Sequence, residues 1–347
     1  MLVVYSEAHR QHDPPFEIAE GGTKQPLFEA PARMERIRAA LDVAGWAAYV
    51  APADHGLAPI LAVHAADYVA FLRTGYARWR AEAAALGAHI DPTVLLGTVW
   101  PSRRAQGRPA TAAGQAGYYA MDTACPIVAG TYAAALTSAH CAVTGADLLL
   151  AGEPAVFALC RPPGHHAGQD FAGGYCYFNN ASIAARRLAA HGRVALLDVD
   201  FHAGNGTQDI FYADPGVLTV DIHAHPERQY PYFAGYAEER GAGPGLGFHH
   251  NFPLPYKTDD ARYLATLAAG LAEIRAFAPR WLVISFGADI YAGDPIGDLA
   301  VTTPGFAAIG AAIAALGLPA LIVMEGGYNT GQLGVNTVNF LTPFAGG

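Results

Sequence analysis

The sequence predicts a single-domain α/β fold in which a central, mostly parallel β-sheet carries helices on both faces. Apolar runs typical of buried strands alternate with helical patterns along most of the chain. The 347 residues are 52% hydrophobic and only 15% charged, which is enough apolar material for one large core. Because we find neither an internal repeat nor a domain linker, residues 1–347 are expected to form one domain.

The expected elements follow from these patterns in order along the chain. Short apolar runs that end at proline, glycine or charged residues predict strands at residues 2–5, 46–50, 155–160, 194–197, 217–222, 281–285 and 320–324. Apolar residues at helical spacing predict helices at residues 33–43, 67–79, 132–143, 180–191, 260–277 and 306–315. Two proline- and glycine-rich segments, residues 7–31 and 87–113, are expected to be long loops.

Charge and cysteine content limit the possible partners and compartment. The 21 basic and 30 acidic residues give a net charge of −9, which argues against a nucleic-acid partner and suits a cationic small molecule. The four cysteines form no CxxC pair, so we expect reduced thiols. We expect no membrane span and no signal peptide, because polar residues interrupt the apolar stretches and the first residues are strand-like. A cytoplasmic location is therefore expected.

The most informative stretch is an apolar strand that ends in three ionisable residues and a glycine-rich turn. Successive side chains alternate along a strand, so Asp198 and Asp200 point the same way, and His202 follows them. Burying three such groups is costly without a cation. The alternative interpretation is that the aspartates cap the following helix and fix a loop. We favour a metal site.

Three other predicted strands also end in polar residues, at 161–166, 287–294 and 325–328. The carboxyl ends of parallel strands lie along one edge of a sheet, so these groups can meet. A catalytic zinc site needs three protein ligands and an open position for water. Asp200, His202 and Asp289 would supply the ligands, and the bound water's pKa would fall towards ~7. The same ligand set would also suit iron(II), cobalt or manganese.

Candidate catalytic residues lie on the neighbouring strand ends. The tandem His165 and His166 would provide a general base and an electrostatic partner. Asp198 is expected to orient His165, whereas the uncharged Asn205 would contact His166 and leave it less basic. Tyr328 would polarise a carbonyl and stabilise the oxyanion that forms from it. The alternatives are histidines satisfied by packing and a tyrosine at the rim of the molecule.

Two aromatic segments could form the walls of a narrow tunnel. Tyr175 follows a Gly-Gly pair, and Tyr230 or Phe233 lies in the loop after the strand at 217–222. Such walls suit an alkyl chain or a cationic amine. Ordinary packing is the alternative interpretation.

Taken together, these motifs resemble the histone deacetylase superfamily of the arginase-deacetylase fold, and within it the bacterial acetylpolyamine amidohydrolases. The resemblance covers nearly the whole chain, in order. It is based on Arg161-Pro162-Pro163-Gly164-His165-His166, Gly173-Gly174-Tyr175-Cys176, Asp198-Val199-Asp200-Phe201-His202, Gly204-Asn205-Gly206-Thr207-Gln208, Asp289 with Asp294-Pro295, and Glu325-Gly326-Gly327-Tyr328.

The resemblance implies hydrolysis of N-acetylated polyamines or related small cationic acylamines, with release of acetate and a free amine. It implies that the zinc ligands are Asp200, His202 and Asp289, and that the catalytic residues are His165, His166 and Tyr328. It also implies a structural potassium ion that is bound by the Asp198 side chain and by the main-chain carbonyls of Asp200, His202 and Ile222.

For residues 7–31, the resemblance implies an inserted loop at a homodimer interface. Glu17 would then meet a substrate ammonium group that is bound by the neighbouring subunit. Tyr175 and Tyr230, the candidate tunnel walls, are the other residues expected to contact the substrate.

The chain departs from the family pattern at two positions. Ala203 stands where most relatives carry a histidine, so altered packing is expected there. Asp221 stands where relatives usually carry a serine, and a second carboxylate would strengthen cation binding or raise its own pKa.

Two rival activities remain open. One is removal of acetyl groups from lysine in proteins or peptides. The other is a binuclear manganese ureohydrolase, for which residues 203–204 and 286–288 lack the additional carboxylates. A binding module without catalysis would be expected to lack a ligand or a catalytic residue, and here none is missing.

Overall fold

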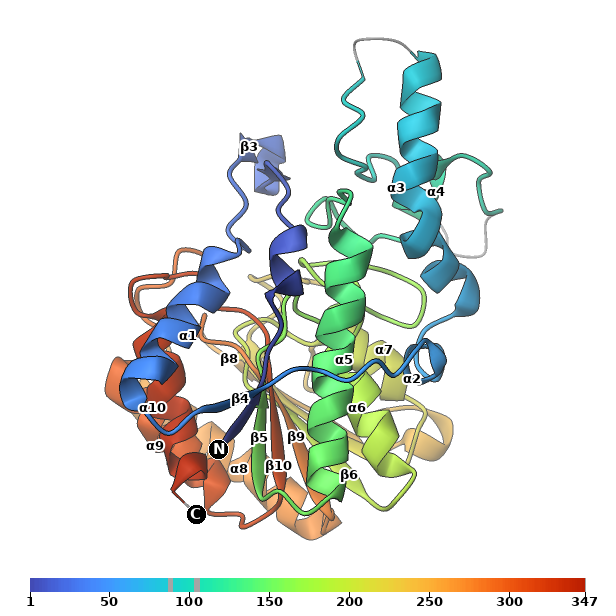
Figure 1. The fold of residues 1–347 in the computed structure, drawn as a ribbon. Coiled ribbons are helices and arrows are strands. Elements are labelled where there is room, and N and C mark those ends of the chain that lie inside the picture. The colour runs from blue at the N-terminus through green and yellow to red at the C-terminus, as the bar shows by residue number, and fades with distance from the viewer. Residues whose placement is uncertain (87–89, 103–106, 347) are drawn as a thin grey trace.

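The computed structural model describes residues 1–86, 90–102 and 107–346. In this part of the chain, the central sheet has eight strands in the order β4-β1-β5-β10-β9-β6-β7-β8, and each neighbouring pair is parallel (Figure 1). The strands are β1 (Leu2–Val4), β4 (Ala48–Val50), β5 (Ala155–Ala158), β6 (Val194–Asp198), β7 (Val217–Ala224), β8 (His249–Leu254), β9 (Trp281–Phe286) and β10 (Ala320–Met324). The predicted α/β class is confirmed.

Helices cover both faces of the sheet and enclose two hydrophobic cores. The first core packs against α3 (Ala66–Leu86), α5 (Thr131–Leu150) and α6 (Asn180–Ala189), with the short helices α2 (Ala58–Leu61), α4 (Ala112–Tyr118) and α7 (Asn205–Phe211) around them. The second core packs against α1 (Ala32–Ala44), α8 (Asp260–Phe277), α9 (Thr303–Ala314) and α10 (Leu333–Ala345). This arrangement matches the layers that a parallel sheet requires.

Strand β6 shows why the central strands are almost entirely apolar. Leu196 packs into the first core, whereas Ala195 and Leu197 pack into the second. Because both faces of the strand are buried, polar side chains are tolerated only at its carboxyl end, where Asp198 lies opposite Asp221 of β7 and Ser285 of β9. The strand thus delivers its ionisable residues to the edge of the sheet.

Helix α5 is the one helix in the described residues that is long and apolar enough to cross a membrane by length and composition alone. In the fold, 61% of its apolar window is buried. The helix contacts α6, β5 and β10. Core helices of soluble domains have the same length and composition, and α5 packs as a core helix.

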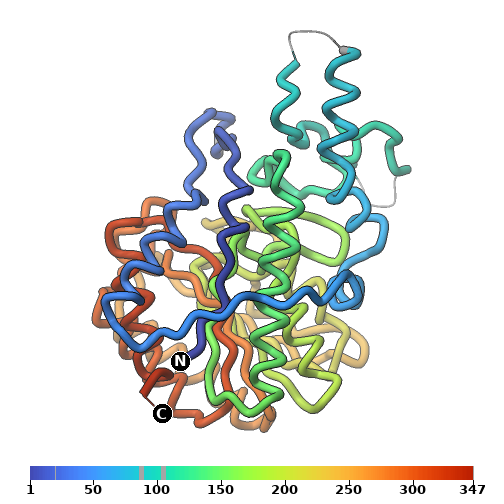
Figure 2. Tube along the Cα trace, viewed as in Figure 1, coloured from blue at the N-terminus to red at the C-terminus, as the bar shows by residue number. Residues whose placement is uncertain are grey.

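Two parts of the molecule stand out beyond the carboxyl ends of the strands (Figures 1 and 2). One is the hairpin of β2 (Glu17–Ile18) and β3 (Lys24–Gln25), which pair antiparallel. With the 3₁₀ turns η1 (Glu7–Gln11) and η2 (Glu20–Gly22), this hairpin gives residues 7–31 more local structure than the predicted loop. The other part is α3 with α4.

The structure extends several sequence predictions. Helix α3 continues to Leu86, beyond the predicted end at residue 79, and α4 begins within the predicted loop 87–113. Residues 87–89 and 103–106 of that loop lie outside the described part of the chain. Strand β8 and helices α7 and α10 were not predicted. A further 3₁₀ turn, η3 (Gly243–Gly245), precedes β8.

Candidate active site

The three predicted metal ligands come together at the carboxyl ends of β6 and β9. Asp200 and Asp289 are fully buried, and the side chain of His202 is only 12% exposed. The His202 Nδ1 atom lies 3.3 Å from both Asp200 Oδ1 and Asp289 Oδ2. Asp289 Oδ2 is buried without a hydrogen bond from any described residue. Two carboxylates and an imidazole that converge at such distances are a donor set that fits a divalent cation.

Two glycines keep the space beside these carboxylates open. A methyl group on Gly287 would overlap Asp200 Oδ2, and one on Gly326 would overlap Asp289 Oδ2. The Gly326 amide also donates to Asp200 Oδ2 at 2.9 Å. Close approach of the backbone therefore explains why both positions are glycine.

The tandem histidines have the partners that were expected. His165 Nδ1 lies 3.0 Å from Asp198 Oδ2, and His166 Nδ1 lies 2.7 Å from Asn205 Oδ1. Although burial opposes it, the carboxylates of Asp200 and Asp198 raise the pKa of His165. Burial, together with the neighbouring His165, lowers the pKa of His166. The two rings, with centroids 4.0 Å apart, are therefore driven towards opposite protonation states.

Glu325 fixes the strand end that carries these histidines. Its Oε2 atom accepts hydrogen bonds from the amides of Gly164 at 2.6 Å and His165 at 3.2 Å. The side chain is fully buried, and burial raises its pKa to about 7. This carboxyl group orients the backbone ahead of His165 and His166.

Tyr328 lies on a turn that is held on both sides. Its amide donates to Asp294 Oδ2 at 2.7 Å, and Arg33 Nε donates to the Gly327 carbonyl at 2.7 Å. The Arg33 guanidinium lies 4.8 Å from the centre of the Tyr328 ring. Burial raises the pKa of Tyr328 well above its usual value, so the phenol remains a hydrogen-bond donor near neutral pH.

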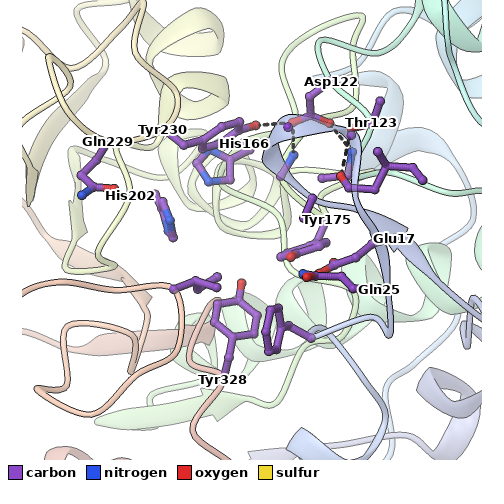
Figure 3. Close-up of a pocket in the computed structure, with 18 residues that line it drawn as sticks. Glu17, Gln25, Asp122, Thr123, His166, Tyr175, His202, Gln229, Tyr230 and Tyr328 are labelled. Atoms are coloured by element: carbon purple, nitrogen blue, oxygen red, sulfur yellow. Dashed lines mark hydrogen bonds between the residues drawn. The ribbon is translucent and has the colours of Figure 1, made fainter.

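A cavity of about 580 Å³ opens above the metal ligands. His166, His202 and Tyr328 line it together with three predicted substrate residues, Tyr175, Tyr230 and Glu17 (Figure 3). Of the two alternatives Tyr230 and Phe233, it is Tyr230 that lines the cavity. Phe233 does not line this cavity and is 91% exposed.

Glu17 reaches this cavity from β2 of the same chain, whereas the resemblance implied that it would meet a substrate bound by the neighbouring subunit. The residue is buried, and its Oε1 atom accepts a hydrogen bond from Gln25 Nε2 at 2.7 Å. Within the described part of the chain, Glu17 Oε2 has no hydrogen-bond partner. After burial, the Glu17 carboxylate is the main cause of the raised pKa of Tyr175, whose side chain lies next to it (Figure 3).

Asp198 and Asp221 lie beside each other on neighbouring strands, and Asp198 contacts His165. A methyl group on Gly204 would come within 2.6 Å of Asp198 Oδ2 and 3.4 Å of Asp221 Oδ2. Burial and the nearby Asp221 carboxylate raise the pKa of Asp198, and the adjacent His165 opposes this rise. Asp221, where the chain departs from the family pattern, is paired with His223, whose Nδ1 atom lies 2.6 Å from Asp221 Oδ1. The His223 Nε2 atom lies 2.8 Å from the Gly235 carbonyl oxygen.

Several residues of the site were missed by sequence reasoning. Asp122 and Gln229 line the cavity, and Arg33 and Glu29 form a fully buried ion pair at 2.8 Å behind Tyr328. Asp122 and Gln229 belong to irregular segments, so no periodicity indicates which way they point. The spacing of Glu29 and Arg33, four residues apart at the start of a predicted helix, was an available signal for their pairing.

Comparisons with known proteins agree with this geometry. A family model described as the histone deacetylase domain matches residues 27–342. Acetylpolyamine amidohydrolase of Mycoplana ramosa is 45% identical over 349 residues, covering 100% of both chains. Acetylpolyamine amidohydrolase 1 of Pseudomonas aeruginosa is 44% identical over 100% of this chain and 99% of that protein.

A solved structure shares the fold over the same length. The crystal structure of acetylpolyamine aminohydrolase from Burkholderia pseudomallei has a TM-score of 0.94 and 40% identity, and it covers 100% of this chain and 99% of that chain. The family match and these full-length similarities cover the strands and loops that build the site. The chain therefore belongs to the histone deacetylase family and is an enzyme of the deacetylase class.

Proposed function

We propose that this enzyme hydrolyses the amide bond of N-acetylated polyamines or related small cationic acylamines, releasing acetate and the free amine. The observation that carries the substrate class is the buried Glu17 Oε2 atom, which has no hydrogen-bond partner among the described residues and belongs to the cavity that holds His166 and Tyr328. A buried carboxylate oxygen of this kind favours a cationic partner. The names of the similar proteins support the same substrate class.

Enzymes of this family depend on a metal, and we propose zinc, with iron(II) or cobalt as alternatives, held by Asp200, His202 and Asp289. The buried Asp289 Oδ2, which accepts no hydrogen bond from the described residues, supports this ligand set. When bound, such a cation supplies Lewis acidity that polarises the amide carbonyl and lowers the pKa of water.

In the first half of the reaction, His166 and Tyr328 act on opposite sides of the amide. Neutral His166, kept unprotonated by burial and oriented by Asn205, accepts a proton from the attacking water. As the new C–O bond forms, the protonated phenol of Tyr328 donates a hydrogen bond to the developing oxyanion. Tyr175 and Tyr230 form the walls around the alkyl chain.

In the second half of the reaction, the C–N bond breaks and the leaving nitrogen takes the proton held by His166. His165, which the carboxylates of Asp198 and Asp200 stabilise as a cation, opposes a second positive charge on His166 and so favours the return of that proton. Acetate and a free amine result, and His166 is neutral again.

Two further parts of the proposal concern a second cation and the oligomeric state. We propose that a structural potassium ion is held by the Asp198 side chain, which is supported by the adjacent buried Asp221 carboxylate. We propose a homodimer that forms through residues 7–31, which is supported by the outward position of the β2–β3 hairpin (Figure 1). Light scattering of the purified protein tests the dimer. A cytoplasmic location remains a prediction.

A side-by-side assay tests the proposed substrate class. The purified, metal-loaded enzyme is given acetylated putrescine, cadaverine, spermidine and spermine, together with acetyl-lysine peptides, and acetate release is measured. We expect kcat/KM to be highest for an acetylpolyamine. Preference for the acetyl-lysine peptides would instead establish the rival activity, and release of urea from a guanidino substrate would overturn the amidohydrolase assignment.

A further inference from the structure

Asp122 lines the cavity and is hydrogen-bonded to one aromatic wall, Tyr230, and to Gly174, the residue that precedes the other wall, Tyr175. Its Oδ2 atom accepts hydrogen bonds from the Tyr230 hydroxyl at 2.6 Å and from the Gly174 amide at 2.8 Å, as Figure 3 shows. Its Oδ1 atom accepts a third hydrogen bond from the Ala124 amide at 2.8 Å. Three protein donors therefore engage this carboxylate before any substrate enters.

The hydrogen bond from Tyr230 to Asp122 fixes a ring that packs against two residues of the candidate active site. The Tyr230 ring stands edge-on to His166, with centroids 4.9 Å apart at 88°, and edge-on to His202, with centroids 5.9 Å apart at 79°. A hydroxyl that donates to a carboxylate makes a shorter and stronger bond than one between neutral groups. Asp122 thus holds one wall against the general base and a metal ligand at the same time.

The bond to Gly174 fixes the opposite wall through the backbone. Gly174 and Tyr175 both lie in the left-handed region, at φ of +50° and +69°. A bulky residue seldom adopts this conformation, and it persists only where the surroundings impose it. The turn places the Tyr175 ring 5.7 Å from the ring of Tyr328. The Asp122 carboxylate anchors this turn at the residue that precedes Tyr175.

We propose that Asp122 is a positioning residue that sets the separation of Tyr175 and Tyr230 and so prepares the cavity for a narrow alkyl chain. The proposal rests on the proposed function, because it concerns the substrate of that same site. Walls that are fixed in advance spare the cost of ordering them when the substrate binds, so the benefit appears in KM more than in kcat.

A second explanation predicts different behaviour. If Asp122 instead attracted the substrate's ammonium group directly, its loss would weaken the binding of cationic substrates only. If Asp122 positions the Tyr230 wall, its loss should weaken the binding of charged and neutral substrates alike. The two explanations are separated by comparing N-acetylputrescine with N-butylacetamide, a neutral amide of similar length.

The test is a double-mutant cycle on the metal-loaded enzyme. Tyr230→Phe removes one hydroxyl, Asp122→Asn removes the charge, and the double variant removes both. From the usual strength of a hydrogen bond to a charged group, we expect each single variant to raise KM about ten-fold on both substrates. The KM of the double variant should be no higher than that of the more impaired single variant, because both changes break the same hydrogen bond.

Tyr236→Phe is the matched control. The Tyr236 hydroxyl donates to the Tyr232 carbonyl at 3.0 Å in the same loop, but Tyr236 does not line the cavity. This variant loses one tyrosine hydrogen bond from that loop and should keep the wild-type KM. Circular dichroism and metal content are measured for every variant, so that a folding or loading defect is recognised.

The outcomes separate this inference from the proposed function. A wild-type enzyme inactive on every acetylpolyamine contradicts the proposed function itself. With an active wild type, unchanged KM in Tyr230→Phe overturns the positioning role, even if Asp122→Asn fails to fold. The role would also be overturned if the KM increases of the two single variants multiplied in the double variant. An increase in KM confined to the cationic substrate would overturn it too.

Discussion

The Nδ1 atom of His166 lies 2.7 Å from Oδ1 of Asn205, so the partner that orients this ring carries no charge. The neighbouring His165 has a carboxylate, Asp198, in the same role at 3.0 Å. A carboxylate stabilises an imidazolium, whereas an amide contributes much less. This difference in partners, together with the burial of His166, assigns the neutral base to His166 and the positive charge to His165.

Replacing Asn205 by aspartate should therefore move the pH profile. A carboxylate beside His166 would stabilise its protonated form and raise its pKa. Because the base works unprotonated, activity is present above its pKa and is lost as the pH falls through it. The acidic limb of kcat/KM against pH should move upward, and activity at pH 7 should fall.

Asn205→Ala serves as the control for this shift. It removes the orienting hydrogen bond without adding a charge, so we expect lower activity with no upward movement of the acidic limb. If the acidic limb of kcat/KM lay at the same pH in Asn205→Asp and in the wild type, His166 would not be the group that titrates there. The base would then have to be another group.

Tyr328→Phe tests the oxyanion role. The ring, its packing against Arg33 and the backbone bond to Asp294 remain, and only the hydroxyl is lost. Loss of one oxyanion donor commonly costs about 10²–10³ in kcat. We expect a fall of that order, with an unchanged circular dichroism spectrum and unchanged metal content. Full turnover on N-acetylputrescine would rule out the role.

The candidate metal ligands could be brought together from the sequence because they lie at strand ends. Regular strands alternate their side chains, and parallel strands share one edge, so Asp200, His202 and Asp289 could be placed together without knowing any loop. The partners of His165 and His166 followed from the same edge. The structure also agrees with the predicted strand at residues 320–324 and the helix at 260–277.

The missed parts depend on contacts distant in the sequence. Asp122 precedes α5, yet it contacts Tyr230 of the segment between β7 and β8, 108 residues later. Strand β8 begins His249-His250-Asn251, a polar start that does not resemble a buried strand. His249 is satisfied there by Gln208 of α7 at 2.9 Å, a partner that local sequence does not reveal.

Removal of the metal should lower the stability of the protein, because the carboxylates of Asp200 and Asp289 then lie close together without a cation. Burial and the nearby Asp200 carboxylate raise the pKa of Asp289 to about 6, whereas His202 opposes this rise. We expect a chelator to abolish activity and zinc to restore it. In metal-free protein, Asp289→Asn should raise the melting temperature by about 2 °C or more, because it removes one of two like charges.

With zinc added, the same variant should bind less metal and lose its advantage over the wild type. Differential scanning fluorimetry and elemental analysis measure the two effects. Asp259→Asn is the control, because Asp259 caps α8 away from the site and asparagine caps a helix equally well. Equal zinc content in Asp289→Asn and the wild type would remove Asp289 from the ligand set.

Glu17→Gln tests how the cation is recognised. The amide keeps the shape of the side chain but loses the charge of the buried Oε2 atom, so a cationic substrate loses a charge-assisted bond. We expect kcat/KM for N-acetylputrescine to fall about ten-fold or more, while that for N-butylacetamide changes little.

Glu7→Gln provides the comparison for that charge effect. Glu7 lies in the same N-terminal segment, but its carboxylate is exposed and pairs with Arg10 and Arg38 rather than lining the cavity. The substitution makes the net charge of the protein less negative by the same amount, so any general attraction of cations would weaken equally in both variants. A selective loss in Glu17→Gln therefore locates the recognition at the cavity. Equal losses on the cationic and the neutral amide would instead mean that Glu17 acts only by holding Gln25 and the Tyr175 wall.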